Sequence, residues 1–91
     1  MAKHKIEVEV TKTITTTTKE VQEVSSKEYI GIKIKEFRLS KGYSQNELSE
    51  KVSFSRSNLS NLELGRFNIT IPVLEEFCQV FNCKSSDILP F

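Results

Sequence analysis

The chain has 91 residues, of which 37% are hydrophobic and 27% charged, and its formal net charge is +1. This composition suits one small domain, and no apolar run approaches the roughly 18 residues that a membrane-spanning helix needs. The first residues mix lysine and glutamate where a secretory signal would be continuously apolar, so we expect a cytoplasmic protein that contacts no membrane.

Residues that commonly carry catalysis or hold metals are sparse. Cys78 and Cys83 are too few for a disulfide scaffold, and the single histidine, His4, is too distant in sequence to complete a tetrahedral metal site with them. Glu75 and Glu76 are adjacent on an expected helix, where neighbours do not face each other. We therefore expect two reduced core thiols, no cofactor, no metal and no enzymatic activity.

Charge is distributed unevenly along the chain. Residues 29–66 hold seven basic and four acidic residues, whereas residues 67–91 hold one basic and three acidic residues. A mildly basic middle segment is compatible with binding to a phosphate backbone but is not evidence for it, because many solvent-exposed faces show a similar excess of basic residues.

Residues 1–24 have the pattern of an extended strand. Apolar Ile6, Val8 and Val10 alternate with charged residues, and Ile14 continues the same parity. The segment contains no Gly, Pro, Asn or Asp, so we expect it to lack the means to fold back as a tight hairpin. Three interpretations stay open: an arm that pairs with another subunit or protein, a disordered tail, or a basic tip that touches DNA.

Helical signals begin at Ser25. Ser25 and Glu28 have the spacing of a capping box, and Gly42 is placed to end the helix in a left-handed turn. An apolar stripe with helical spacing lies between them, formed by Ile30, Ile34 and Phe37. The pattern predicts a first helix over residues 26–40.

Two short helices follow. Ser44 and Glu47 repeat the capping box and predict a helix over residues 45–52. Ser55 is a good N-cap for a third helix over residues 55–64, which Gly65 ends. With Ser55 counted as the N-cap, residues 53–55 form a turn of three residues between the two helices, which is the spacing of a helix-turn-helix.

The third helix is built largely from residues that helices disfavour. Ser57, Asn58, Ser60 and Asn61 together cost roughly 2 kcal/mol of helix propensity relative to alanine. On a helical wheel Leu59 and Leu62 lie together, and the opposite side carries hydrogen-bonding residues: Arg56, Ser57, Ser60 and Asn61. This arrangement favours a helix anchored in the core whose polar face lies in the major groove of DNA.

Two further helices complete the expected fold. Thr70 can cap a fourth helix with Pro72 in its first turn, and Asn82 tolerates the left-handed conformation that would end it. Ser85 and Asp87 predict a last short helix. We therefore predict an all-α, five-helix domain over residues 25–91, preceded by an extended, β-type arm over residues 1–24.

The stretch IKEFRLSKGYSQNELSEKVSFSRSNLSNLELG resembles the helix-turn-helix domain of the Cro and lambdoid-repressor type, also called the XRE family. The positions that match the pattern are Arg38, Gly42, Ser44, Gln45, Leu48, Ser55, Leu59, Glu63 and Gly65. The resemblance covers roughly residues 29–89 and does not extend to the arm.

The resemblance implies a role for each matching polar position. Residues of the third helix would contact base edges: Arg56, Ser57, Asn61 and Ser60. Arg56 suits the O6 and N7 atoms of guanine, and Asn61 suits the N6 and N7 atoms of adenine. Other residues would contact phosphates: Ser44, Gln45, Asn58, Arg66, Asn68 and Thr70. Arg38 and Glu63 would form a structural ion pair.

The chain departs from the family pattern at several positions, among them Ser49, where the family usually has a small alanine, and Cys78 and Cys83, where it tends to have alanine and valine. Ser53 stands where the family often has a turn glycine, and serine there would cost about 1 kcal/mol if the backbone needs positive φ. Leu64 places an apolar side chain where a polar one is common, and it could contact sugar or a thymine methyl group.

We therefore expect a sequence-specific DNA-binding regulator in the cytoplasm, associated with the nucleoid and acting as a repressor. It would bind double-stranded DNA as a homodimer, with the arm as one route to dimerisation, and would occupy a palindromic operator with half-sites about 34 Å apart. The alternative is an antitoxin or protein-interaction module whose arm binds a partner protein by adding a strand to its sheet.

Overall fold

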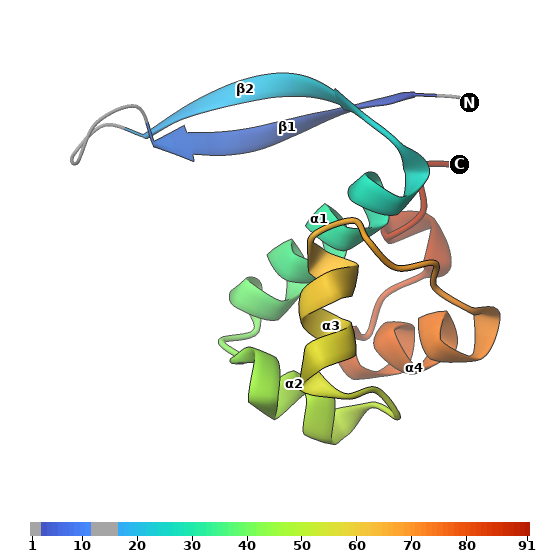
Figure 1. Ribbon diagram of the computed structural model, residues 1–91. Coiled ribbons are helices and arrows are strands. Elements are labelled where there is room, and N and C mark those ends of the chain that lie inside the picture. The colour runs from blue at the N-terminus through green and yellow to red at the C-terminus, as the bar shows by residue number, and fades with distance from the viewer. Residues whose placement is uncertain (1–2, 12–16) are drawn as a thin grey trace.

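The computed structural model describes residues 3–11 and 17–91 (Figure 1). Two strands come first, β1 (His4–Thr11) and β2 (Thr17–Val24). Four helices follow: α1 (Ser26–Ser40), α2 (Gln45–Lys51), α3 (Arg56–Glu63) and α4 (Ile71–Phe81). Among the described residues, no helix combines the length and the apolar character needed to cross a membrane.

The described residues form four α-helices and not the five helices that we predicted. The fifth is a single 3₁₀ turn, η1 (Ser85–Asp87), in which the Lys84 backbone N–H donates to Asp87 Oδ2 at 2.9 Å. Asn82, with φ of 53°, and Pro90 bound this segment, and a residue before proline avoids helical geometry. The fold is therefore a mostly helical domain with a small antiparallel sheet, and not all-α.

The N-terminal segment is a hairpin, so our expectation that it could not fold back was wrong. β1 and β2 pair antiparallel, with His4 opposite Val24 and Thr11 opposite Thr17. Five residues separate the two strands, and a connection of that length does not require the glycine or asparagine of a two-residue turn. Ile14, which we expected to continue the apolar face, lies outside the described residues.

The base of the hairpin is attached to the N-terminus of α1. Ile6 and Val24 are 5% and 4% exposed, so the apolar face of the strands is buried at this end. His4 Nε2 lies 2.9 Å from Ser26 Oγ, and the His4 ring meets Tyr29 edge to face at 6.0 Å. Figure 1 shows the rest of the hairpin extending away from the helices.

One hydrophobic core holds the helices together. Its most buried members come from every helix and from the residue after η1: Ile34, Leu48, Leu59, Leu62, Phe77, Phe81 and Ile88. Gly31 lets α1 approach α3 closely, because a Cβ atom there would lie 2.2 Å from the carbonyl oxygen of Leu62. The apolar side of α3 therefore packs closely against α1.

The predicted helix caps are present at three of the four sites. Ser25 with Glu28 and Ser44 with Glu47 form complete capping boxes, and Ser55 Oγ accepts the Asn58 N–H at 3.1 Å. Thr70 precedes α4 without a side-chain cap hydrogen bond. Hydrogen bonds from the backbone N–H and hydroxyl groups of Ser25 and Ser44 lower the pKa values of Glu28 and Glu47 below the ordinary range.

Candidate nucleic-acid interface

The two faces of α3 differ sharply in burial. Leu59 and Leu62 are each 0% exposed, whereas Arg56, Ser57 and Asn58 are exposed and Ser60 and Asn61 are half-buried. Arg56 and Ser60, like Ser57 and Asn61, are four residues apart and so are neighbours on the helix surface. The four residues expected to contact bases therefore form one contiguous polar patch, which we call the α3 polar face.

A buried ion pair fixes α3 against α1. Arg38 Nε donates to Glu63 Oε2 at 2.7 Å, and Arg38 Nη2 donates to Glu63 Oε1 at 3.0 Å. Arg38 Nη1 also donates to the carbonyl oxygen of Tyr43 at 2.9 Å. The fork geometry of guanidinium matches a carboxylate at two points, so the pair sets both the distance and the orientation of the two helices.

Gln45 extends this network to α2. Its Nε2 atom donates to Glu63 Oε1 at 3.2 Å, and the side chain is half-buried. The same amino group carries a second N–H. The family resemblance implies that Gln45 contacts a phosphate and also braces the third helix, and the bond to Glu63 in α3 is a contact that can brace it.

The turn between α2 and α3 is tied to α4. The backbone N–H of Ser53 donates to Glu76 Oε1 at 2.9 Å. Among the described residues Asn82 is the one non-glycine residue with positive φ, so the serine at this turn position carries no left-handed strain. Sequence reasoning assigned no contact to Glu76 and therefore missed this bond.

The remaining residues expected at phosphates lie around the same helices. Ser44 is exposed at the start of α2, where its Oγ accepts the Glu47 N–H at 3.1 Å. Arg66, Asn68 and Thr70 are exposed in the segment that joins α3 to α4. This segment leaves α3 through Gly65, at φ of 77°, and the Arg66 N–H donates to the carbonyl oxygen of Asn61 at 2.9 Å.

Leu64 follows α3 directly and is 58% exposed, so an apolar side chain is available beside the α3 polar face. Such a group suits contact with a sugar or with a thymine methyl group.

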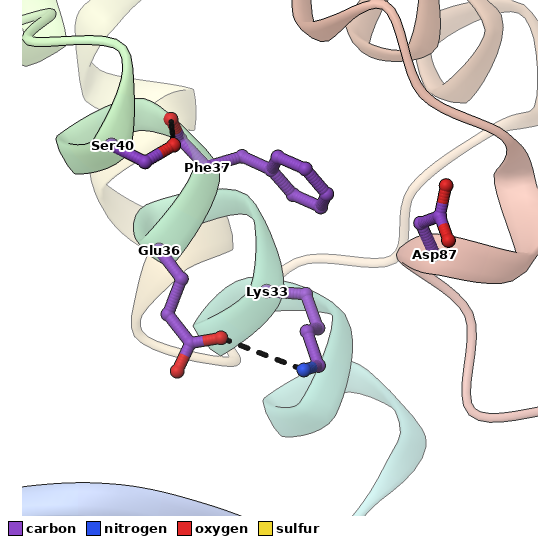
Figure 2. Close-up of a pocket in the computed structure, with 5 residues that line it drawn as sticks. All are labelled: Lys33, Glu36, Phe37, Ser40 and Asp87. Carbon is purple, nitrogen blue, oxygen red and sulfur yellow. Dashed lines mark hydrogen bonds and ion pairs between the residues drawn. The ribbon is translucent and has the colours of Figure 1, made fainter.

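A separate hollow of about 380 Å³ lies between α1 and η1. Figure 2 shows the side chains that line it: Lys33, Glu36, Phe37, Ser40 and Asp87. Lys33 Nζ and Glu36 Oε1 are 3.6 Å apart and pair across one helical turn. None of the expected DNA-contacting residues lines this hollow, so it is distinct from the α3 polar face.

The two cysteines are half-buried free thiols near the C-terminal end of α4. Burial, and next the neighbouring Cys78, raise the pKa of Cys83 to about 11. Among the described residues, no group of three His, Cys, Asp or Glu side chains could hold a metal ion.

A short helix anchored by two leucines, braced through a buried ion pair and presenting Arg, Ser and Asn outward defines a helix-turn-helix DNA-binding domain. The family model described as "Helix-turn-helix" matches residues 34–88. The chain therefore belongs to the helix-turn-helix family of the XRE type, whose members are DNA-binding transcriptional regulators.

Three known proteins illustrate the similarity. An uncharacterized HTH-type transcriptional regulator of Archaeoglobus fulgidus is 34% identical over 59 residues, which are 65% of this chain and 84% of that protein. The competence pilus inhibition repressor of Acinetobacter baylyi is 36% identical over 59 residues, 65% of this chain and 54% of that one. The crystal structure of SinR, the master regulator for biofilm formation, in complex with DNA has a TM-score of 0.60 and 38% identity, and the match covers 63% of this chain and 92% of that chain.

Proposed function

We propose that this chain is a sequence-specific transcriptional repressor that binds a palindromic operator as a dimer, with α3 in the major groove of each half-site. The observation that carries the proposal is the division of α3 into a fully buried leucine edge and an outward polar face. A helix of this kind is held rigidly while its short side chains allow close approach to base edges. The likeness to a repressor and to a regulator crystallised with DNA supports this function.

The residues of the α3 polar face have distinct proposed roles. Arg56 is exposed at the first position of the helix, where its guanidinium can donate to both O6 and N7 of guanine. Asn61 can accept from N6 and donate to N7 of adenine. Ser57 and Ser60 would donate to bases or to the nearest phosphate.

The phosphate contacts would position α3 without reading sequence. Gln45 would use its second N–H on a phosphate while the first holds Glu63, so that DNA binding and helix bracing use one side chain. Ser44 would donate its hydroxyl proton while its Oγ accepts from Glu47. Asn58 beside Ser55, and Arg66, Asn68 and Thr70 beyond α3, would provide the flanking contacts.

Selection of binding sites from random DNA, with the full-length protein at low salt, tests this function. We expect a palindrome whose half-sites lie about one helical turn apart. Arg56→Ala should cost about 1–3 kcal/mol on that site and relax preference at one position, whereas Gln45→Ala should weaken binding evenly across sequences. Lys84→Ala removes a cation outside the α2–α3 region and is the matched control. Failure of the wild-type protein to enrich any palindrome would reject the proposal.

A further inference from the structure

The cap at the end of α4 brings two thiols together. Asn82 follows the helix in the left-handed conformation, with φ of 53° and ψ of 51°. The Asn82 N–H donates to the carbonyl oxygen of Gln79 at 3.3 Å, and the Cys83 N–H donates to that of Cys78 at 3.0 Å. These two bonds define the Schellman motif, in which the residue after the left-handed one contacts the residue five positions before it. In this chain those two residues are Cys83 and Cys78.

The two cysteines are neighbours only because of this cap. In a continuous α-helix, residues five positions apart are separated by about 140° around the axis and do not face each other. The hydrogen bond from Cys83 N to Cys78 O limits the distance between the two Cα atoms to at most about 7 Å, from bond lengths alone. Native disulfides join Cα atoms roughly 4.4–6.8 Å apart. The backbone therefore holds the pair near the separation that a disulfide requires.

The side chains of the pair are also in contact. Both thiols are free and half-buried, and both pack against the hydrophobic core. Burial raises the pKa of Cys83 to about 11, and the charge of Cys78 and a hydrogen bond with its side chain add to this rise. A hydrogen bond between two thiols forms only at short range, so the sulfur atoms lie close together.

We propose that Cys78 and Cys83 form an oxidation site, at which a small disulfide compound such as glutathione disulfide converts the two thiols of the folded domain into an intramolecular disulfide. This site goes beyond the proposed function. All residues proposed to contact DNA precede α4, so the disulfide would use none of them.

Cys78 is the thiol that a small disulfide compound can reach first. It lines a hollow of about 430 Å³ between α4 and the chain that follows, together with Gln79, Ser85 and Leu89. Cys83 is not among the residues of this hollow, and its raised pKa leaves little thiolate at neutral pH. Because the thiolate is the attacking species, the first attack falls to Cys78 and the second to Cys83.

The oxidation consists of two thiol–disulfide exchanges. The Cys78 thiolate attacks one sulfur of glutathione disulfide, the S–S bond of that molecule breaks, and one glutathione leaves as a thiolate that takes up the proton lost by Cys78. The Cys83 thiolate then attacks the Cys78 sulfur of the mixed disulfide, and the second glutathione leaves and takes up the proton lost by Cys83. The two cysteines lose two electrons and glutathione disulfide gains them, so no other oxidant is needed.

The disulfide would fasten the last turn of α4. It would close a ring over residues 78–83, which includes Phe81, a core residue that is 2% exposed. A cross-link that fits the folded geometry stabilises a protein mainly by restricting its unfolded chain. We therefore expect the oxidised protein to have a Tm at least about 5 °C above that of the reduced protein.

Equilibration of the full-length protein with reduced and oxidised glutathione tests this site. After quenching with acid, mass spectrometry separates the reduced protein, the glutathione adduct and the intramolecular disulfide, whose mass is lower by two hydrogen atoms. The proportions give the effective concentration of one thiol toward the other. We expect this concentration to be at least about tenfold higher in native buffer than in urea, because the cap holds the two thiols together only in the folded chain.

Three variants serve as controls. Asn82→Gly keeps the left-handed cap, because glycine adopts positive φ without strain, and it should form the disulfide as readily as the wild type. Cys78→Ser and Cys83→Ser cannot close the ring. Each should carry at most one glutathione and should gain no Tm on oxidation.

The proposal is overturned if the effective concentration in native buffer does not exceed that in urea. It is also overturned if the oxidised wild type melts below the reduced wild type, since the disulfide would then distort the fold. Disulfide-linked dimers as the main product, or a gain in Tm that a serine variant shares, would reject it as well. All of these measurements are made without DNA, so their failure leaves the proposed DNA binding standing.

Discussion

Replacing Gly31 with alanine tests how closely α1 approaches α3. An added Cβ would lie 2.2 Å from the Leu62 carbonyl oxygen and 3.1 Å from that of Glu63, and both are backbone atoms that cannot rotate away. The two helices would have to separate by about 1 Å, which belongs to the overpacking changes that typically cost about 1–3 kcal/mol. Alanine also gains about 0.8–1.0 kcal/mol of helix propensity over glycine. Because the overlap is with backbone atoms, we take the upper part of the overpacking range, about 2–3 kcal/mol, and expect a net destabilisation of about 1–2 kcal/mol.

Thermal and urea unfolding followed by circular dichroism measure this change. A loss of 1–2 kcal/mol should lower Tm by about 4–16 °C in a domain of this size. Separation of the helices should also stretch the bonds of 2.7 and 3.0 Å between Arg38 and Glu63, so we expect weaker operator binding even where the variant is fully folded.

Gly42→Ala is the control for backbone conformation, because Gly42 has φ of 76° but no atom within 4 Å of an added Cβ. It should cost about 1 kcal/mol through strain and leave DNA binding unchanged. A Gly31→Ala variant as stable as the wild type, or more stable, would refute the close approach of α1 and α3.

Three other predictions follow from single contacts. The double variant Glu28→Gln with Glu47→Gln should be less stable than the wild type at neutral pH. Because folding lowers the pKa values of both glutamates, the difference in Tm between variant and wild type should be full above about pH 4.5 and should vanish as the pH falls further. Tm measured as a function of pH checks this. Glu76→Ala should cost about 1 kcal/mol in urea unfolding by removing the acceptor of the Ser53 N–H, while exposed Glu75→Ala should change stability by less than about 0.5 kcal/mol. Since the pKa of Cys83 is raised to about 11, iodoacetamide should alkylate it far more slowly at pH 8 in the native protein than in urea, and equal rates would contradict its burial.

Local signals predicted the helices well. Capping boxes depend on residues three apart, so Ser25 with Glu28 and Ser44 with Glu47 located the starts of α1 and α2 correctly. The left-handed end of α4 was predicted in the same way, because asparagine is one of the few residues that accept φ of 53° there. These features are decided within one turn of chain, where sequence carries most of the information.

Features decided by distant contacts were predicted less well. The hairpin was missed because we judged it by the residues of a tight turn, whereas pairing between His4 and Val24 depends on the burial of Ile6 and Val24 against the helices. The bond from Ser53 to Glu76 joins two residues that are 23 positions apart, and no local sequence pattern predicts it. The family resemblance supplied the Arg38–Glu63 pair, which periodicity alone could not have found.

The composition of α3 can be explained because one face packs against the domain and the other face is free for hydrogen bonding. A helix of eight residues that contains Ser and Asn at four positions would not be stable alone, because nucleation is costly and propensity is poor. Leu59, Leu62 and the buried carboxylate of Glu63 supply contacts with the rest of the domain that hold it in place. Since none of these three residues belongs to the α3 polar face, the outward residues can be chosen for hydrogen bonding and small size. Changes on that face can therefore alter which bases are contacted while the packing that positions the helix stays the same.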